Sequence, residues 1–592
     1  MTEPATPLVR WLLLQPAEAS VAHLIQHAKL DPLVARLLVG RGVTTAAEAL
    51  AFLTPPLRSL PDPHLMADAE KAAACIVEAI QRGTKICIYG DYDVDGVSAA
   101  ALLHGLFARL GHPAQVFLPD RIRDGYGLHM QRLSELADAG VELFIAVDCG
   151  TTAVAEIAML RARGLQFIVC DHHTLGPELP DATALLNPQR PDCHYPDKHL
   201  CAVGVALVLA MALRRALGPA GQAIDLKDLL EFAALGTIAD VVPLRGVNRT
   251  LAWHGLRHLG HSKRAGIQAL AAQAGPQQGV GADRVGFHLG PRINAAGRVA
   301  DARTAFQLLT TADPAEAQEL AVRIETENNR RRTIQGDVVR AAVEQAKTQE
   351  GREHAVVVAG KDWHPGVVGI VASRLKDEFA VPAFVFGIDE DGLARGSGRS
   401  IAGYDLTEGL RACCGDGLAE RFGGHAFAAG VTLKEANVQA FRERLVRHVA
   451  GVLPPEARHR DVLIDLELPI TELSFDVLER IDLLEPFGKG NARPTILLRG
   501  VELAEMQVVG QGRDWVRGKL AEPGRQAVWA RANIAIFGAL AVFGEFQRGD
   551  RVDAVVRLER NAFQGRVSLQ ATVEGLRAAG GEVVLVPGGF PD

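Results

Sequence analysis

Ile86-Cys-Ile-Tyr-Gly-Asp-Tyr-Asp-Val-Asp-Gly96 joins a short apolar run to a group of aspartates. The first four residues have the length and composition of a buried strand. The acidic turn after them leads directly into a segment with helical spacing that begins at Val97. This order of strand, polar turn and helix is typical of α/β proteins, in which functional groups follow the strands.

The same alternation extends on both sides of this stretch. Apolar runs predict strands at residues 86–89, 115–118, 143–147, 167–170 and 184–186, and helical spacing occupies residues 97–110, 128–139 and 151–163. Repeated βα units of this length predict a parallel, doubly wound sheet with helices on both faces. Two further helices are expected at 202–217 and 226–239.

Acidic and histidine residues fall at the ends of three of these predicted strands. Asp93 and Asp95 follow the first, Asp148 follows the third, and Asp171, His172 and His173 follow the fourth. The carboxyl ends of parallel strands share one edge of the sheet, where ligands bind. So many carboxylates in one place repel each other unless cations hold them, and carboxylates with imidazoles suit Mn²⁺ or Mg²⁺. The pattern therefore predicts a two-cation hydrolytic site, which Asp240 joins from the end of a helix.

The whole chain is predicted to be an α/β multidomain protein. The central sheet is followed by a long charged helix that connects to a smaller α/β domain, and six short apolar runs near the end predict an OB-like β-barrel. Composition shifts and proline-rich stretches place the boundaries at residues 1–60 (a helical segment), 61–312, 313–350 (the connecting helix), 351–452 and 458–580 (the barrel).

Charge and cysteine content limit the classes of function. The chain has 592 residues, with 63 basic residues against 70 acidic ones, so a polyanionic partner has to be held by local basic groups or metal ions. The eight cysteines form no CxxC pair and lie mostly in apolar runs, which favours a reducing, cytoplasmic compartment. The longest uncharged apolar stretch, residues 200–213, is too short to cross a membrane.

Five short motifs together resemble those of the DHH/DHHA1 phosphoesterase superfamily. They are Asp91-Tyr-Asp-Val-Asp-Gly96, Val147-Asp-Cys-Gly150, Asp171-His-His173, Gly236-Thr-Ile-Ala-Asp240 and Gly423-Gly-His-Ala-Phe-Ala-Ala-Gly430. Finer matches resemble the bacterial single-strand-specific exonucleases of this superfamily: Asp120-Arg-Ile-Arg-Asp-Gly-Tyr-Gly127, Gly290-Pro-Arg-Ile-Asn-Ala-Ala-Gly-Arg298, His364-Pro-Gly-Val-Val-Gly369, Gly396-Ser-Gly-Arg399 and Glu485-Pro-Phe-Gly-Lys-Gly-Asn491. The resemblance extends from about residue 50 to 575. It implies a DHH domain, a connecting helix, a DHHA1 domain and an OB-like single-strand-binding domain.

The resemblance also implies roles for single residues. The ligands of two Mn²⁺ or Mg²⁺ ions would be Asp93, Asp95, Asp148, His172 and Asp240. His173 would contact the scissile phosphate, and Asp171 would orient the neighbouring imidazoles.

Phosphate contacts are expected from a second group of residues. The resemblance implies that Arg121, Ser397 and Arg399 hold the 5′-terminal phosphate. Further candidates for phosphate or DNA contact are Arg292, Asn294, Arg298, His364 and His425, although His364 is equally well read as a cap at a strand end. Aromatic residues of the β-rich part, among them Phe487 and Trp515, are read either as core residues or as a platform for stacked bases.

The predicted function is metal-dependent 5′→3′ hydrolysis of single-stranded DNA to mononucleotides, in DNA repair and recombination. One alternative is a small-substrate DHH phosphoesterase acting on oligoribonucleotides or cyclic dinucleotides, and another is a catalytically inactive scaffold that binds single-stranded DNA. The resemblance implies single-strand-binding protein and a RecQ-type helicase as partners. A monomer is expected, because the predicted domains already supply a cleft.

Overall fold

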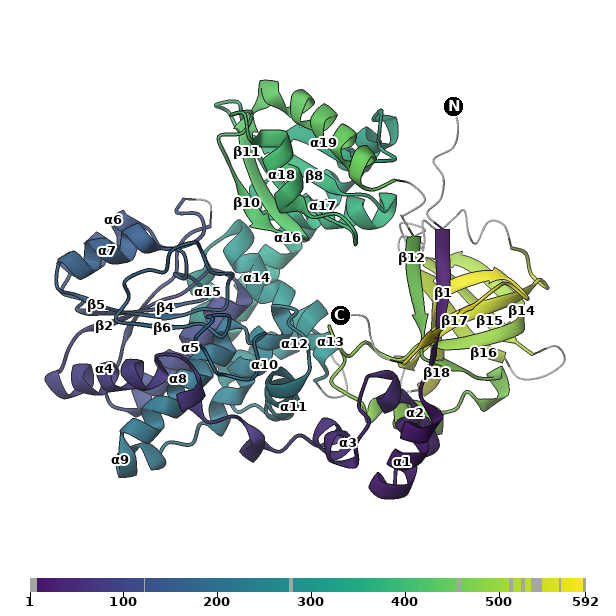
Figure 1. Ribbon diagram of the computed structural model, residues 1–592, viewed down its shortest axis with the longest axis horizontal. Helices are drawn as coiled ribbons and strands as arrows, with labels where there is room; N and C mark the ends of the chain where they lie inside the picture. The colour runs from purple at the N-terminus through teal and green to yellow at the C-terminus, as the bar shows by residue number, and fades with distance from the viewer. Residues whose placement is uncertain are drawn as a thin grey trace. The chain divides into compact units, whose positions relative to one another are not determined.

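A computed structural model describes residues 8–121, 123–275, 280–454, 459–509, 515–522, 527–533, 546–563 and 566–588. The chain forms two compact units (Figure 1). The central unit comprises residues 50–331 and 484–492, and the flanking unit comprises the described parts of 1–49, 332–483 and 493–591.

The central unit is built on a five-stranded, all-parallel sheet. Its strands are β2 (Ile86–Tyr89), β3 (Gln115–Phe117), β4 (Leu143–Val147), β5 (Gln166–Cys170) and β6 (Ala184–Leu186), in the order β3-β2-β4-β5-β6. The strand order reverses between β2 and β4, so the edge of the sheet beyond those two strands is where a ligand is expected. The predicted parallel α/β sheet is thus confirmed.

Helices cover both faces of this sheet because successive strand residues point to opposite sides. Ile86 and Ile88 face a cluster with α4, α5, α8 and α10, whereas Cys87 and Tyr89 face one with α6 and α7. The helices of this unit are α4 (Ala69–Arg82), α5 (Val94–Arg109), α6 (Met130–Asp138), α7 (Val154–Ala162), α8 (Ala202–Ala216), α9 (Gly218–Gln222), α10 (Leu230–Ala239), α11 (Gly246–Gly260), α12 (Ala265–Gln273), α13 (Ala282–Arg284), α14 (Gly290–Val299) and α15 (Ala302–Thr310).

The predicted long helix is α16 (Pro314–Thr348), which carries two separate narrow apolar stripes. Ala317, Ala321 and Ile324 are buried in the core of the central unit. Val338, Ala342 and Ala346 are buried in a core of the flanking unit. The helix therefore contributes one stripe to each unit.

The α/β part of the flanking unit has a mixed sheet in the order β10-β11-β9-β8-β7, in which only β7 and β8 are parallel. Its elements are β7 (Val356–Lys361), α17 (Pro365–Phe379), β8 (Ala383–Ile388), β9 (Leu393–Arg399), α18 (Leu406–Cys414), β10 (Arg421–His425), β11 (Ala428–Lys434) and α19 (Val438–Val452). Apolar runs at residues 355–358 and 383–386 predict β7 and β8, whereas the sequence pattern does not predict β9 to β11. Strand β9 carries Gly396 and Gly398 because a Cβ there would lie 2.3 Å from the rings of Phe386 and Phe384.

The predicted OB-like barrel closes through strands β14 and β17. Its strands are β13 (Leu466–Glu467), β14 (Ile496–Val509), β15 (Trp515–Ala521), β16 (Ala527–Asn533), β17 (Arg551–Phe563) and β18 (Arg566–Ala578). They are ordered β13-β14-β15-β16-β18-β17, and β14 also pairs with β17. Helix α20 (Phe475–Asp482) precedes β14.

The N-terminal segment differs from the all-helical prediction for residues 1–60. It contains α1 (Glu18–Ala28), α2 (Pro32–Gly40) and α3 (Ala46–Leu53), but begins with strand β1 (Leu8–Gln15). β1 lies between β12 (His459–Ile464) and β19 (Val584–Pro587), parallel to both (Figure 1). A short, mainly apolar segment fits either a helix or a strand, and here the pairing partners lie more than 440 residues away.

This segment is tied firmly to the barrel part of the chain. Trp11 is buried against Ile464, Leu497 and Val555, and the guanidinium of Arg577 lies 3.9 Å from its ring centroid. Arg41 and Asp465 form a buried ion pair at 2.9 Å. Among the described residues, no helix is long and apolar enough to cross a membrane. All eight cysteines lie in the described part, and each is free.

Candidate metal centre and phosphate contacts

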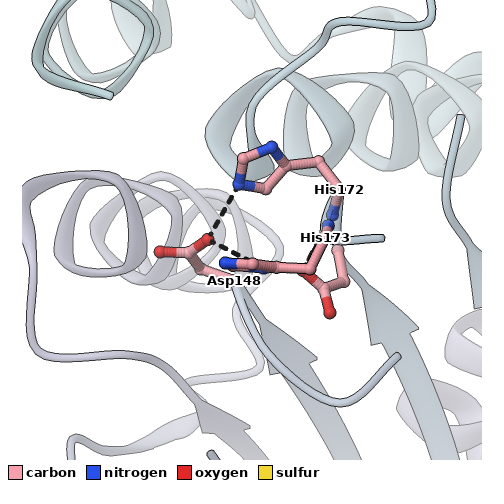
Figure 2. Close-up of side chains that lie close together, drawn as sticks. Asp148, His172 and His173 are labelled. Atoms are coloured by element: carbon pink, nitrogen blue, oxygen red, sulfur yellow. Dashed lines mark hydrogen bonds and ion pairs between the residues drawn. The ribbon is translucent and has the colours of Figure 1, made fainter. Parts of the chain in front are cut away.

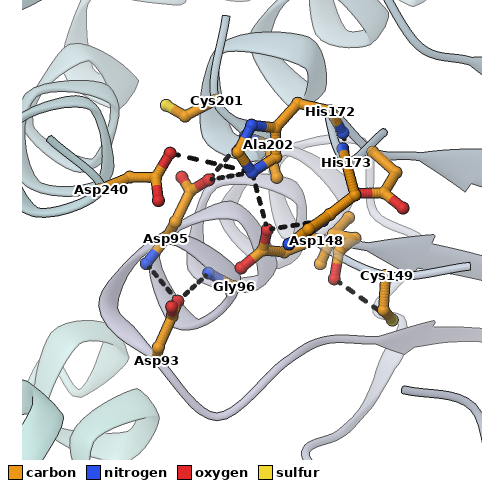
Figure 3. Close-up of polar contacts among 12 residues, drawn as sticks. Asp93, Asp95, Gly96, Asp148, Cys149, His172, His173, Cys201, Ala202 and Asp240 are labelled. Carbon is orange, nitrogen blue, oxygen red and sulfur yellow. Dashed lines mark hydrogen bonds and ion pairs between the residues drawn. The ribbon is translucent and has the colours of Figure 1, made fainter. Parts of the chain in front are cut away.

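Three parallel strands deliver the predicted acidic and histidine residues to one edge of the sheet (Figure 3). Asp93 and Asp95 follow β2, Asp148 follows β4, and His172 and His173 follow β5. Asp240 reaches the same place from the end of α10. All seven residues predicted for the centre, Asp171 included, therefore lie in the central unit at the expected edge.

The first two aspartates are fixed by helix N-termini. Asp93 precedes α5 and its side chain accepts hydrogen bonds from the backbone N–H groups of Asp95 (2.9 Å) and Gly96 (3.2 Å). The buried Asp95 carboxylate accepts from the N–H groups of Ala202 (2.6 Å) and Val203 (2.9 Å) at the start of α8. Amide donors at a helix N-terminus favour an ionised carboxylate and hold it in one orientation.

A glycine on α10 makes room for the Asp95 carboxylate. A Cβ at Gly236 would lie 2.5 Å from Asp95 Oδ1 and 2.6 Å from Val203 Cγ1. No side chain other than hydrogen fits there without moving the carboxylate. This explains in physical terms the glycine that begins the motif ending at Asp240.

His172 lies among three carboxylates. Its Nε2 is 3.3 Å from Asp148, 3.7 Å from Asp240 and 3.9 Å from Asp95 (Figures 2 and 3). Asp148 has a backbone φ of 62°, a left-handed conformation that is costly for a residue with a Cβ. Such strain at a turn with a buried carboxylate is typical of functional sites.

The Asp171 carboxylate holds the histidine pair in place. Its carboxylate accepts from the N–H groups of Thr151, His172 and His173, and lies 2.7 Å from His173 Nδ1. Although burial opposes charge on both partners, this bond raises the pKa of His173 to about 9 and keeps that of Asp171 well below its usual range. The Tyr126 hydroxyl lies 3.2 Å from both ring nitrogens of His173.

The remaining carboxylates are forced toward protonation when no cation is present. Burial, followed by repulsion from Asp93, raises the pKa of Asp95 to about 7 and that of Asp148 well above its usual range. Burial and the neighbouring Asp95 and Asp93 raise the pKa of Asp240 to about 8. Bound cations relieve this repulsion. Three overlapping groups have ligand atoms close enough together to hold an ion: Asp148, Asp171, His172 and His173; Asp95, His172 and Asp240; and Asp91, Asp93 and Asp148.

Asp91 is a member of the site that the sequence prediction did not include. It is buried, burial and Asp93 raise its pKa strongly, and its Oδ1 has no hydrogen-bond partner among the described residues. A buried carboxylate oxygen without a donor fits a cation-binding role. The sequence signal that could have identified Asp91 is its position in the same acidic turn as Asp93.

Basic groups border the acidic turn on one side. The Arg121 guanidinium lies 4.9 Å from the ring centroid of Tyr92. Burial, and then the charge of Arg121, lower the pKa of Arg298 to about 10, so the two cations lie close together. Asn294 accepts a hydrogen bond from the N–H of Val94 (3.2 Å) and so caps α5 beside the metal ligands. Arg121 and Arg298 therefore place two positive charges near the acidic turn, and Asn294 supports the turn.

Arg292 is engaged elsewhere. Its guanidinium binds Glu325 on α16 at 2.6 and 3.3 Å and also donates to the carbonyl groups of His288 and Gln273. With its donors directed at these partners, it anchors α14 to α16 rather than facing DNA. We therefore leave it out of the proposed contacts.

The other predicted phosphate contacts lie in the flanking unit. Arg399 donates to the Ser397 hydroxyl (2.9 Å), and both side chains lie over Gly369 of α17, where a Cβ would be 3.1–3.2 Å from their polar atoms. His364 accepts from the N–H of Gly366 through Nδ1 and so caps α17, which favours the cap interpretation. His425 is exposed at the end of β10.

Phe487 is a core residue and not part of a stacking platform, because its side chain is only 5% exposed and it belongs to the central unit. The side chains of Trp515, Trp529, Phe537 and Phe563 lie outside the described residues.

Comparisons with known proteins agree with this architecture. Residues 85–237 match the DHH family N-terminal domain, 333–451 the DHHA1 domain and 464–575 the RecJ OB domain. Fold and site therefore define a phosphoesterase of the DHH class with a DHHA1 domain and an OB barrel.

The chain belongs to the RecJ family of single-stranded-DNA-specific exonucleases. It is 36% identical over 502 residues to RecJ of Salmonella typhimurium, covering 82% of this chain and 86% of that protein. It is 39% identical over 511 residues to RecJ of Bacillus subtilis, covering 86% of this chain but only 64% of the longer relative. The crystal structure of RecJ with Mn²⁺ from Thermus thermophilus matches with a TM-score of 0.81 at 33% identity, covering 98% of this chain and 80% of that one.

Proposed function

We propose that this chain hydrolyses single-stranded DNA from its 5′ end to mononucleotides, with two divalent cations as cofactors. The observation that carries the proposal is the buried group of carboxylates around His172, whose pKa values are raised by burial and mutual repulsion. Its relatives of known structure are RecJ complexes with Mn²⁺ and with Mg²⁺, and oxygen and imidazole ligands suit both ions.

The ions would be held by Asp93, Asp95, Asp148, His172 and Asp240, and we add Asp91 because of its unpaired buried oxygen. When bound, the cations would activate water and neutralise charge on the phosphate. The chain's contribution is to hold these ligands in fixed positions. The N-termini of α5 and α8 do this for the first two carboxylates.

His173 contacts the phosphate of the bond that is cleaved. Asp171 keeps it protonated and fixes its ring through Nδ1, so that the imidazolium stabilises negative charge as it develops on the phosphate. The Tyr126 hydroxyl is a second polar partner of the same ring.

Two separate groups bind further phosphates. Arg121 and Arg298 bind the strand beside the acidic turn. Ser397 and Arg399 form an anion site in the flanking unit, where the missing side chain at Gly369 leaves room for their polar atoms, with His425 as a further contact. Recognition of a 5′-terminal phosphate would give the enzyme its direction of digestion.

The partners and surroundings are proposed from the family resemblance. Single-strand-binding protein and a RecQ-type helicase would supply the substrate strand, and the chain would act as a monomer. The eight free cysteines are consistent with a reducing, cytoplasmic compartment.

The test uses 40-nucleotide single strands labelled internally, with a 5′-phosphate, a blocked 5′ end, a blocked 3′ end, or a complementary strand. Mn²⁺-dependent release of mononucleotides is expected from the unpaired strands with a free 5′ end, and not with EDTA or after Asp148→Ala. Digestion that requires a free 3′ end, or that proceeds equally on the duplex, would contradict the proposal. Cleavage of dinucleotides only would favour the small-substrate alternative.

A further inference from the structure

A loop far along the chain docks beside the metal-centre residues. Residues 484–492 follow α20 of the flanking unit, yet they belong to the compact central unit. Gly488 and Asn491 exchange backbone hydrogen bonds of 2.9 and 3.1 Å, which makes a tight turn with Lys489 and Gly490 at its tip. Gly490 has a φ of 73°, which glycine adopts without strain.

The base of this loop is anchored by two buried polar side chains. The Arg249 guanidinium donates to the carbonyl groups of Leu484, Glu485 and Pro486 at 2.8–3.4 Å. Asn491 donates from Nδ2 to Leu484 and Pro486, both at 2.9 Å. The carbonyl groups of Leu484 and Pro486 each accept from both side chains, so the base of the loop is held by a network of buried hydrogen bonds.

The tip of the loop is pinned just after Asp240. The N–H of Leu244 donates to the Lys489 carbonyl at 2.8 Å, and Arg245 Nε donates to the Gly490 carbonyl at 2.8 Å. Both donors follow Asp240 within five residues, across a sharp bend at Val241 with φ 58°. Asp240 and the Lys489 backbone are therefore held in a fixed relation.

The Lys489 side chain is exposed, and it makes no ion pair within the described part of the chain. The ammonium is close enough to Asp240 for the two charges to attract each other. The lysine is exposed to solvent and lies on an anchored turn beside the acidic centre. A positive charge in this position can bind an anion that approaches the centre.

We propose that Lys489 is a substrate-contacting residue, which binds a backbone phosphate of the single-stranded DNA next to the bond that is cut. The assignment rests on the proposed function of the metal centre to which Asp240 belongs. It gives the anchored loop a role: Arg249 and Asn491 act through the backbone to present one positive charge where the strand enters the metal centre.

The test compares Lys489→Ala, Lys489→Arg and the matched control Lys71→Ala, which removes an exposed lysine from α4. The salt dependence of binding to single-stranded DNA is measured in EDTA, and kcat and KM for Mn²⁺-dependent release are measured at several salt concentrations. Mn²⁺ affinity without DNA is measured by electron paramagnetic resonance.

Lys489→Ala is expected to lower kcat/KM about tenfold, mainly through KM, because one charged phosphate contact is lost. The slope of log affinity against log salt should fall by about 0.7, the value for one phosphate of a single strand. Lys489→Arg should restore both, Lys71→Ala should change neither, and Mn²⁺ affinity should not fall.

An unchanged salt slope in Lys489→Ala, or equal losses in the alanine and arginine variants, would overturn the assignment. A parallel loss of Mn²⁺ affinity would also overturn it, because the residue would then serve the metal centre alone. Absence of Mn²⁺-dependent release in the unaltered chain would instead refute the proposed function, while the binding measurement in EDTA would still report on Lys489.

Discussion

Replacing Gly236 by alanine tests how strictly the structure holds the Asp95 carboxylate. The new Cβ would lie 2.5 Å from Asp95 Oδ1, whereas ordinary contacts begin at 3.4 Å, so the carboxylate or α10 must shift by about 0.9 Å. Such a shift weakens the bonds from Ala202 and Val203 that orient the carboxylate. Since misplacement by about 1 Å can cost about 10²-fold in rate, we expect kcat to fall about 100-fold.

The expected effect on stability is much smaller than the effect on rate. Overpacking lowers the free energy of unfolding by about 1–3 kcal/mol, whereas the higher helix propensity of alanine raises it by about 1 kcal/mol. The free energy of unfolding should therefore fall by about 0–2 kcal/mol. Gly105→Ala is the control, since its Cβ would lie 3.6 Å from the nearest atom, Leu229 Cδ2. Release of nucleotides from single-stranded DNA and thermal unfolding are measured for both variants. If Gly236→Ala retained more than about a third of the rate, the fixed position of Asp95 would not matter as argued.

Three further changes probe the site and the N-terminal strand. Asp171→Asn should lower the pKa of His173 from about 9 toward its ordinary value, measured by NMR titration, and reduce kcat about 10–100-fold; an unchanged pKa would contradict the pairing. In the metal-free protein the pKa values of Asp95 and Asp240 are raised to about 7 and 8. Protonation of these two groups therefore stabilises the metal-free fold fully below about pH 4, and this stabilisation is lost as the pH rises through 7–8. The increase in melting temperature produced by Mn²⁺ should therefore grow from pH 6 to pH 9, and a flat profile would contradict this. Trp11→Ala should destabilise the barrel by about 3–5 kcal/mol in thermal unfolding, and a loss below 1 kcal/mol would show that β1 is dispensable.

The parallel sheet and its acidic edge could be predicted because the relevant signals are local. The strand Ile86–Tyr89 and the strand Leu143–Val147 are short apolar runs whose bounds agree with the structure. The polar residues that follow them are adjacent in sequence, and the geometry of parallel strands brings them together.

The features that could not be predicted depend on contacts between distant parts of the chain. Strand β1 is set by β12 and β19, and β9 carries glycines where a strand pattern expects apolar residues. The ion pair of Arg292 with Glu325 and the docking of Lys489 beside Leu244 have no local signal, because each joins segments separated by 33 or more residues.

The most direct test of the metal centre is the number of Mn²⁺ ions bound per chain, measured by electron paramagnetic resonance at pH 8 and compared with the rate of nucleotide release. We expect two ions in the unaltered chain, with release that rises as the second site fills. After Asp148→Asn we expect no more than one tightly bound ion and a loss of release, since this carboxylate belongs to two of the three ligand groups. Undiminished binding of two ions in Asp148→Asn, or release that continues in EDTA, would contradict a two-cation centre.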